Sequence, residues 1–184
     1  MKRYIVLAST AAMAVIAAEA YAFDGTINFA GTVSNITCTI AAAGGNNIGT
    51  VTLPTVTQSA LKAVGDTAGT TQFTIQLSGC SGSPSPTKAA AWFETGSEVN
   101  DAGRLVATVE GTTTSALSIA LYNMGSPTPI VIGQGDGSLG SSGRDFDISG
   151  SGTTLKYQAK YYAETTGVPP GKVQAKVNYT IQYQ

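Results

Sequence analysis

The sequence contains no histidine, two cysteines and few charged residues, which make up 11% of its 184 residues. Without histidine, the usual nucleophile–base pairs of hydrolases cannot form and the commonest nitrogen ligand of metal sites is missing. The formal net charge is -1, and the basic residues form no cluster of the kind that nucleic acids require. We therefore expect no enzymatic activity, no metal or cofactor, no small-molecule substrate and no nucleic-acid partner.

The beginning of the chain has the pattern of an export signal. Lys2 and Arg3 precede an apolar run over residues 5–18, which is too short to span a bilayer comfortably. The run leads into Ala20-Tyr21-Ala22, a cleavage pattern with small residues at both ends. Residues 1–22 are thus predicted to be a signal peptide, and the remaining chain is expected to function outside the cytoplasm as one domain.

Both cysteines, Cys38 and Cys80, lie in the part that is expected to be exported. In an oxidising compartment an isolated pair of cysteines usually forms a disulfide. A metal site is disfavoured because neither histidine nor a third sulfur ligand is present. We expect a Cys38–Cys80 disulfide.

The middle of the chain is rich in residues that favour strands and turns. Apolar residues alternate with polar ones, for example in TQFTIQLSG and ALSIALY, and clusters of Gly, Asn, Ser and Pro separate these runs. Residues 88–93 are also interpreted as a strand. This spacing predicts an all-β sandwich.

The last thirteen residues, KVQAKVNYTIQYQ, alternate throughout between apolar and polar side chains. The pattern predicts one long strand over residues 172–184 with its apolar face on the core. Residues 155–163 alternate similarly, so that a closing hairpin with its turn at residues 167–171 is expected. A final strand that simply completes a sandwich would have the same pattern.

A second good strand pattern lies just after the predicted cleavage site. In FDGTINFAGTVSNITC one face of the strand carries five residues: Gly25, Ile27, Phe29, Gly31 and Val33. This strand pairs either within its own domain or with another chain.

With these patterns in place, the sequence resembles the chaperone–usher pilins, in particular type 1 fimbrial major subunits. The resemblance is carried by GTINFAGTVSNITC, IQLSGC with the second cysteine, KAAAWFETG, YQAKYYA, and PPGKV with IQYQ at the end. It implies an incomplete immunoglobulin-like β-sandwich that lacks its last strand and is completed by donor-strand exchange, a strand-addition mode. The implied organisation is a donor-strand extension at residues 23–34 and a pilin domain at residues 35–184.

The resemblance also assigns roles to residues. Ile27, Phe29, Gly31 and Val33 would enter successive pockets of the next subunit, Gly31 because its pocket is narrow; a bulge or plain flexibility is the other explanation for this glycine. Five residues near the end of the chain resemble the strand that forms the edge of the groove and that a pilus chaperone would contact: Gly171, Val173, Val177, Ile181 and Tyr183. Core packing is an equally good role for the last four, and Gly171 also fits a simple turn.

The expected function is therefore that of a structural subunit of a fimbria, or pilus, that supports cell adhesion. The expected partners are identical or related pilins, a periplasmic pilus chaperone and an outer-membrane usher. The expected location is the bacterial cell surface, reached through the periplasm. Two alternatives remain: a minor, adhesive subunit that binds a host glycan through residues such as Trp92, and a free-standing secreted sandwich.

Overall fold

The computed structural model describes residues 27–135, 139, 144–148 and 150–184. The predicted signal peptide and the start of the predicted extension lie outside these residues. Within them the chain is strand and loop, as the alternating patterns predict, apart from one turn of 3-10 helix, η1 (Gln58–Ala60). The strands are β1 (Thr37–Ala42), β2 (Thr67–Ser81), β3 (Lys88–Phe93), β4 (Leu105–Val109), β5 (Thr112–Asn123), β6 (Phe146–Asp147), β7 (Thr153–Ala163), β8 (Val173–Gln174) and β9 (Tyr179–Tyr183).

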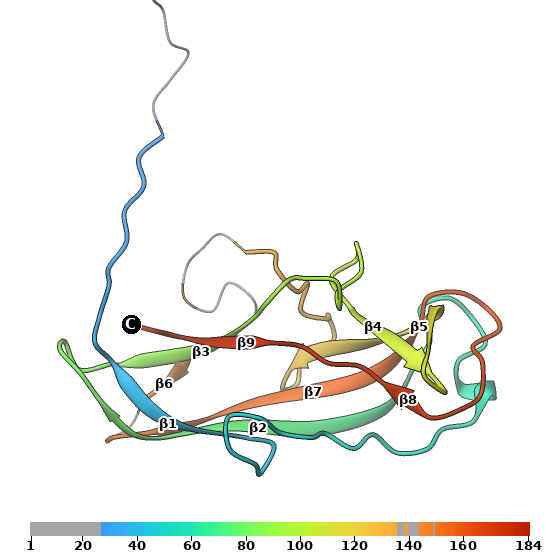
Figure 1. The fold of residues 1–184 in the computed structure, drawn as a ribbon, viewed down its shortest axis with the longest axis horizontal. Helices are drawn as coiled ribbons and strands as arrows, with labels where there is room; N and C mark the ends of the chain where they lie inside the picture. The colour runs from blue at the N-terminus through green and yellow to red at the C-terminus, as the bar shows by residue number, and fades with distance from the viewer. Residues whose placement is uncertain (1–26, 136–138, 140–143, 149) are drawn as a thin grey trace, which may run out of the picture. The chain divides into compact units, whose positions relative to one another are not determined.

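These strands form two antiparallel sheets (Figure 1). The larger sheet has the order β1-β2-β7-β5-β4-β8, and the smaller one has the order β6-β3-β9. Buried side chains from both sheets belong to one apolar cluster, so the two sheets pack face to face as a sandwich.

Tyr157 of β7 lies at the centre of this core and is 1% exposed. Its ring is stacked against Phe73, and it meets Phe93 and Phe146 edge to face, with ring centroids 5.2 to 5.9 Å apart. The main-chain N–H of Ala91 in β3 donates a hydrogen bond to its hydroxyl group. Burial raises the pKa of Tyr157 to about 12. Strands of both sheets are thus held against one neutral tyrosine.

The end of the chain differs from the predicted hairpin and from the predicted single strand. β7 pairs with β2 on one edge and with β5 on the other, so that it has no free edge for the last strand. β8 pairs with β4 in the large sheet instead, and β9 pairs with β3 in the small one. The prediction of one strand over residues 172–184 was therefore wrong, because the chain crosses between the sheets at residues 175–178.

The predicted disulfide is confirmed. Cys38 in β1 is bonded to Cys80 in β2, and their Cα atoms lie 4.1 Å apart. The bond fastens the edge strand β1 to its neighbour close to Ser34, the first residue of the compact unit. In the chain-entropy model a closed loop of this length stabilises the fold by roughly 4 kcal/mol.

The outer face of the large sheet carries a polar cluster around Glu164, which follows β7. The guanidinium of Arg104 donates two hydrogen bonds of 2.6 Å to its carboxylate. Ser118 and Asn100 each donate one more, at 2.7 and 2.8 Å. The side chains of Arg104 and Glu164 are only 14% and 18% exposed. One carboxylate at the end of β7 thus joins β5 and the loop before β4.

We expect Glu164→Gln to lower the free energy of unfolding by about 2 to 3 kcal/mol at pH 7, since charge-assisted bonds are lost and Arg104 is left partly buried without its partner. The hydrogen bonds from Arg104 lower the pKa of Glu164 below its ordinary value of 4.5. The stabilisation should therefore be complete above that pH and be lost as the pH falls through the folded pKa. Urea unfolding at several pH values measures both effects.

The matched control is Asp145→Asn. Asp145 also forms an ion pair, with Lys88 at 2.8 Å, but both side chains are well exposed. Exposed pairs contribute little to stability. An equal loss from the two substitutions, or a difference between Glu164→Gln and the unchanged chain that is independent of pH, would contradict the role given to Glu164.

Candidate assembly site

The outer edge of β9 is open. β9 hydrogen-bonds to β3 on one side, and none of the described strands pairs with its other side. An unpaired strand edge is a template on which another strand can add. β9 is therefore the first component of a candidate assembly site.

The register of β9 shows which main-chain groups face the open edge. Gln184 and Lys88 exchange both main-chain hydrogen bonds, and Glu94 donates to the carbonyl oxygen of Asn178. Because bonded and non-bonded pairs alternate along an antiparallel ladder, Thr180 and Gln182 also bond to β3. The N–H and C=O groups of the remaining three residues point away from β3: Tyr179, Ile181 and Tyr183.

A second unpaired stretch of extended chain follows β1. Residues 50–56 belong to none of the described strands, and no main-chain hydrogen bond is found for them within the described part of the chain. Their apolar side chains Val51, Leu53 and Val56 are half-buried, with Leu53 packed on the main core. Residues 50–56 thus have free main-chain hydrogen-bonding groups and one apolar face, like an edge strand, but no neighbouring strand pairs with them in the described part of the chain.

The sequence reasoning did not identify residues 50–56 as part of the site. The run TVTLPTVT is rich in β-branched residues, and it alternates at Val51 and Leu53. Pro54 has no N–H group and interrupts the run, although a proline is compatible with an edge strand. The alternation before Pro54 was the signal that could have identified this segment.

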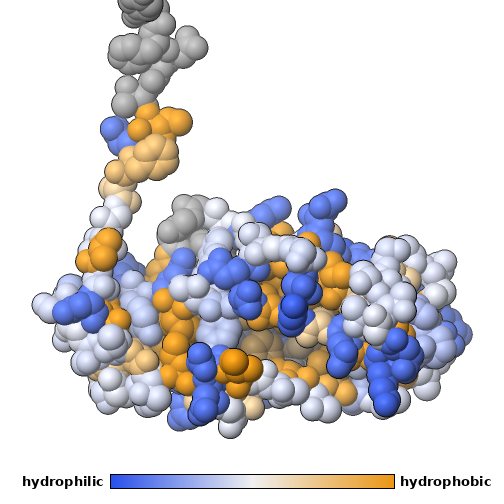
Figure 2. Space-filling model, in the orientation of Figure 1, coloured by the Kyte–Doolittle hydropathy of each residue, from blue (hydrophilic) through white to orange (hydrophobic). Residues whose placement is uncertain are grey.

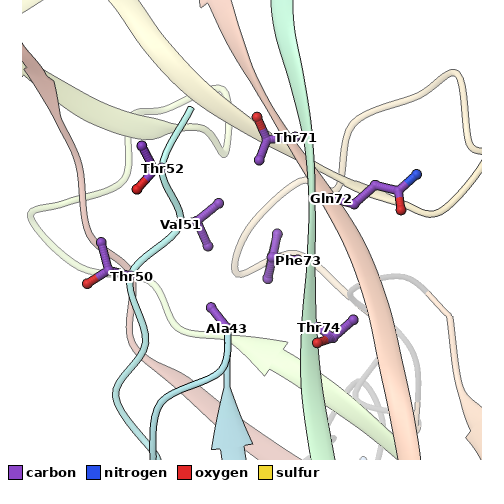
Figure 3. A pocket seen from close by; sticks show the side chains of 8 residues that line it. All are labelled: Ala43, Thr50, Val51, Thr52, Thr71, Gln72, Phe73 and Thr74. Carbon is purple, nitrogen blue, oxygen red and sulfur yellow. The ribbon is translucent and has the colours of Figure 1, made fainter. Parts of the chain in front are cut away.

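A hollow of about 330 Å³ separates this segment from β2. Figure 3 shows Val51 and Phe73 on its two sides, with threonines around them. Figure 2 shows apolar surface, coloured orange, exposed on the face that carries β8 and β9. The core is therefore incompletely covered here.

The core-facing side chains near the end of the chain are only half-buried although they pack on the main core: Val173, Val177, Tyr179, Ile181 and Tyr183. Partial burial raises the pKa of Tyr179 and of Tyr183. The hydroxyl of Tyr179 donates a hydrogen bond of 2.9 Å to the main-chain oxygen of Asn47 in the loop after β1. This bond connects β9 with the chain that leads into residues 50–56.

The described part of the predicted donor segment, residues 27–33, belongs to a unit separate from the one that begins at Ser34. Its apolar side chains are almost fully exposed: Ile27 is 80%, Phe29 92% and Val33 100% exposed. These three large apolar side chains would lie on the same face of an extended strand. Their exposure to water is unfavourable and therefore needs an explanation.

Gly31 lies among these residues. A Cβ atom added to it would meet nothing within 4 Å, and its φ is not in the left-handed region. Neither crowding nor backbone conformation within the described chain therefore requires glycine here. The requirement, if it is steric, comes from something that the segment binds.

Gly171 precedes β8 in a tight place. Its φ is +146°, and an added Cβ would lie 2.7 Å from Val109 Cγ1 and 2.7 Å from Glu110 Cγ. The N–H of the next residue, Lys172, donates to the carboxylate of Glu110 at 2.6 Å. Gly171 thus lets the chain pass close to the turn between β4 and β5, where β8 begins.

We expect Gly171→Ala to destabilise the chain by about 2 kcal/mol, through a steric clash and backbone strain together. The control is Gly167→Ala, because Gly167 has a φ of +78° but an open space around it. Strain alone should cost about 1 kcal/mol there. Urea unfolding compares the two, and equal costs would contradict the importance of the close approach.

Trp92, the residue considered for glycan stacking, is half-buried on β3. Its indole N–H donates to one carboxylate oxygen of Glu94 at 3.1 Å, and Thr180 donates to the other at 2.6 Å. These bonds give Trp92 a role in fastening β3 to β9. The alternative of a glycan-binding subunit is therefore not favoured.

Among the described residues, no group of three or more acidic, cysteine or histidine side chains could hold a metal ion. The described part of the chain also contains no helix long and apolar enough to cross a membrane. What the described chain offers instead is an incomplete immunoglobulin-like β-sandwich with open strand edges.

Comparison with known proteins identifies the family. Residues 27–184 match the family model described as "Fimbrial protein". The chain is 36% identical to the major fimbrial subunit SMF-1 of Stenotrophomonas maltophilia, over 89% of this chain and 95% of that protein. It is also 36% identical to the F17 fimbrial protein of Escherichia coli, over 89% of each chain.

The fold agrees with a solved structure. The crystal structure of the P pilus rod subunit PapA superposes with a TM-score of 0.58, covering 80% of this chain and 99% of that one, at 19% sequence identity. The chain belongs to the fimbrial protein family and is a chaperone–usher pilin, a structural subunit and not an enzyme. The predicted family is thereby confirmed, and such subunits form pili on the cell surface.

Proposed function

We propose that this pilin polymerises head to tail by donor-strand exchange: the segment that includes residues 27–33 of one subunit lies beside β9 of the next. One observation carries the proposal. The chain has an open β9 edge over an incompletely covered core, and it also has an exposed segment whose apolar residues share one parity. Each feature supplies what the other lacks. A contact of this kind joins two different surfaces, and it builds an open fibre when the rotation between subunits does not close a ring.

The energy available to such a contact is substantial. Complete burial of Ile27, Phe29 and Val33 would contribute roughly 5 to 9 kcal/mol in total. Each main-chain hydrogen bond to Tyr179, Ile181 or Tyr183 would add about 0.5 to 1.5 kcal/mol. Gly31 would fit where the groove is too narrow for a side chain. These terms act against the entropy cost of association.

The same open edge argues for assistance before assembly. A subunit with an unpaired edge and exposed core side chains is prone to aggregate. We assign to a periplasmic chaperone the task of covering β8 and β9 through Val173, Val177, Ile181 and Tyr183, and to an outer-membrane usher the task of exchanging the chaperone for the next subunit. Transit through the periplasm and a role in cell adhesion belong to the same proposal.

Amide hydrogen exchange tests the position of the added strand. In assembled fibres, the amides of Ile181 and Tyr183 should exchange slowly, because the added strand bonds to them. In the unassembled subunit freed of its chaperone they should exchange fast, while Thr180 and Gln182 are protected in both states by β3. Equal protection of all four amides before and after assembly would contradict strand addition at β9.

A further inference from the structure

The chain that leads from the donor segment into β1 is held along its length by the end of β2 and the turn that follows. Residues 35 to 38 each meet one residue of 80 to 83, in a single antiparallel register. The four contacts are the Cys38–Cys80 disulfide, the Thr37–Ser81 pair with hydroxyl oxygens 3.4 Å apart, the close approach of Ile36 to Gly82, and a 2.8 Å hydrogen bond from the Ser83 N–H to Asn35 Oδ1. We name residues 35–38 and 80–83 the arm clamp.

Two of these contacts depend on the identity of the residue. A Cβ atom on Gly82 would lie 2.6 Å from Ile36 Cα and 2.9 Å from Ile36 Cγ1, so that only glycine allows this approach. Asn35 replaces a main-chain acceptor with its side-chain oxygen and thereby extends the register beyond the first residue of β1. The contacts thus go further than the strand pairing itself.

The next position in the register is Pro84. Proline has no N–H group and cannot continue a ladder of hydrogen bonds. In the segment that runs opposite, this position corresponds to Ser34, the first residue of the compact unit. Ser34 is exposed. The clamp therefore ends between Asn35 and Ser34.

We propose that the arm clamp makes the junction between neighbouring subunits stiff, a role that rests on the proposed donor-strand exchange. Val33 is the last residue of the donor face, and it would be held in the groove of the next subunit. Asn35 is already held by its own subunit. Only Ser34 lies between these two points, and a linker of one residue transmits orientation far better than a flexible linker does.

Fibres made from the full chain test this role. Asn35→Ala removes the hydrogen bond to Ser83, and Gly82→Ala pushes Ile36 away. Both substitutions should increase amide exchange at residues 35–38 in the fibre and shorten its persistence length in electron micrographs. The control is Gly96→Ala: Gly96 has a φ of +159°, close to the +154° of Gly82, but nothing lies within 4 Å of its added Cβ. It should change neither quantity.

The possible outcomes are distinct. If the unchanged chain forms fibres without using its donor segment, the proposed function fails and the clamp has no such role. If Asn35→Ala forms fibres of unchanged persistence length, the clamp is a local contact only and the inference fails while donor-strand exchange stands. Loss of fibres with Asn35→Ala would also contradict the inference, because a clamp that sets stiffness leaves donation intact. The same criteria apply to Gly82→Ala, which alters a different contact of the arm clamp: a shorter persistence length supports the inference, and an unchanged one contradicts it.

Discussion

A copy of residues 24–34 joined to the C-terminus through a short linker is expected to convert this pilin into a stable monomer. β9 is the last strand of the chain and carries the open edge. A copy joined after it can therefore turn back, run beside β9 and fill the groove of its own chain. Burial of three large apolar side chains should add roughly 5 to 9 kcal/mol, which corresponds to an increase in the unfolding midpoint of about 10 to 35 °C for a domain of this size. Thermal unfolding and size-exclusion chromatography measure both properties.

The control for this experiment is the same extension with aspartate in place of the residues that copy Ile27 and Phe29. It has the same length and the same linker, but it would bring carboxylates into an apolar groove and should not stabilise the chain. The incomplete-fold account is wrong if the unextended chain already unfolds cooperatively, as a monomer, at the temperature of the extended one.

Phe29→Asp is expected to abolish polymerisation and to leave the folded subunit unchanged. Phe29 is 92% exposed, so that no packing in its own subunit depends on it. In the groove of a neighbour, the aspartate would be desolvated without a partner, at a cost of several kcal/mol. Electron microscopy of sheared fibres measures assembly, and co-purification measures chaperone binding, which should persist.

Asn28→Asp provides the matched control for this substitution. It adds the same charge one residue away, on the opposite face of the donor strand, which is expected to face solvent after insertion. Fibres of normal length from Phe29→Asp would show that the donor face is wrongly assigned. An equal loss from Asn28→Asp would show that charge alone, and not burial, prevents assembly.

The sequence predicts the parts of this fold that depend on local pattern. Alternation identifies the strands around Ile75 and Leu121, whose side chains are 2% and 3% exposed in the core. The cysteine pair predicts the disulfide, because the sequence has no other cysteine. The family follows from the order of its motifs.

The pairing of the last strand was not predictable in the same way. Residues 172–184 alternate identically whether they form one strand or two, and only the occupied edges of β7 decide that β8 and β9 join different sheets. The arm clamp was missed for a related reason. Its contacts join residues more than forty positions apart, and Asn35 and Gly82 are ordinary loop residues in the sequence.

Photo-crosslinking from position 29 tests the central claim most directly. A photoreactive phenylalanine analogue replaces Phe29, and fibres are grown from a mixture of subunits with natural and heavy nitrogen isotopes. The account predicts crosslinks to peptides that contain residues 50–56 or residues 173–184, with mixed isotopes in the crosslinked pairs. Crosslinks that form only within one chain, or that form to other surfaces, would contradict the donation of this strand to a neighbouring subunit.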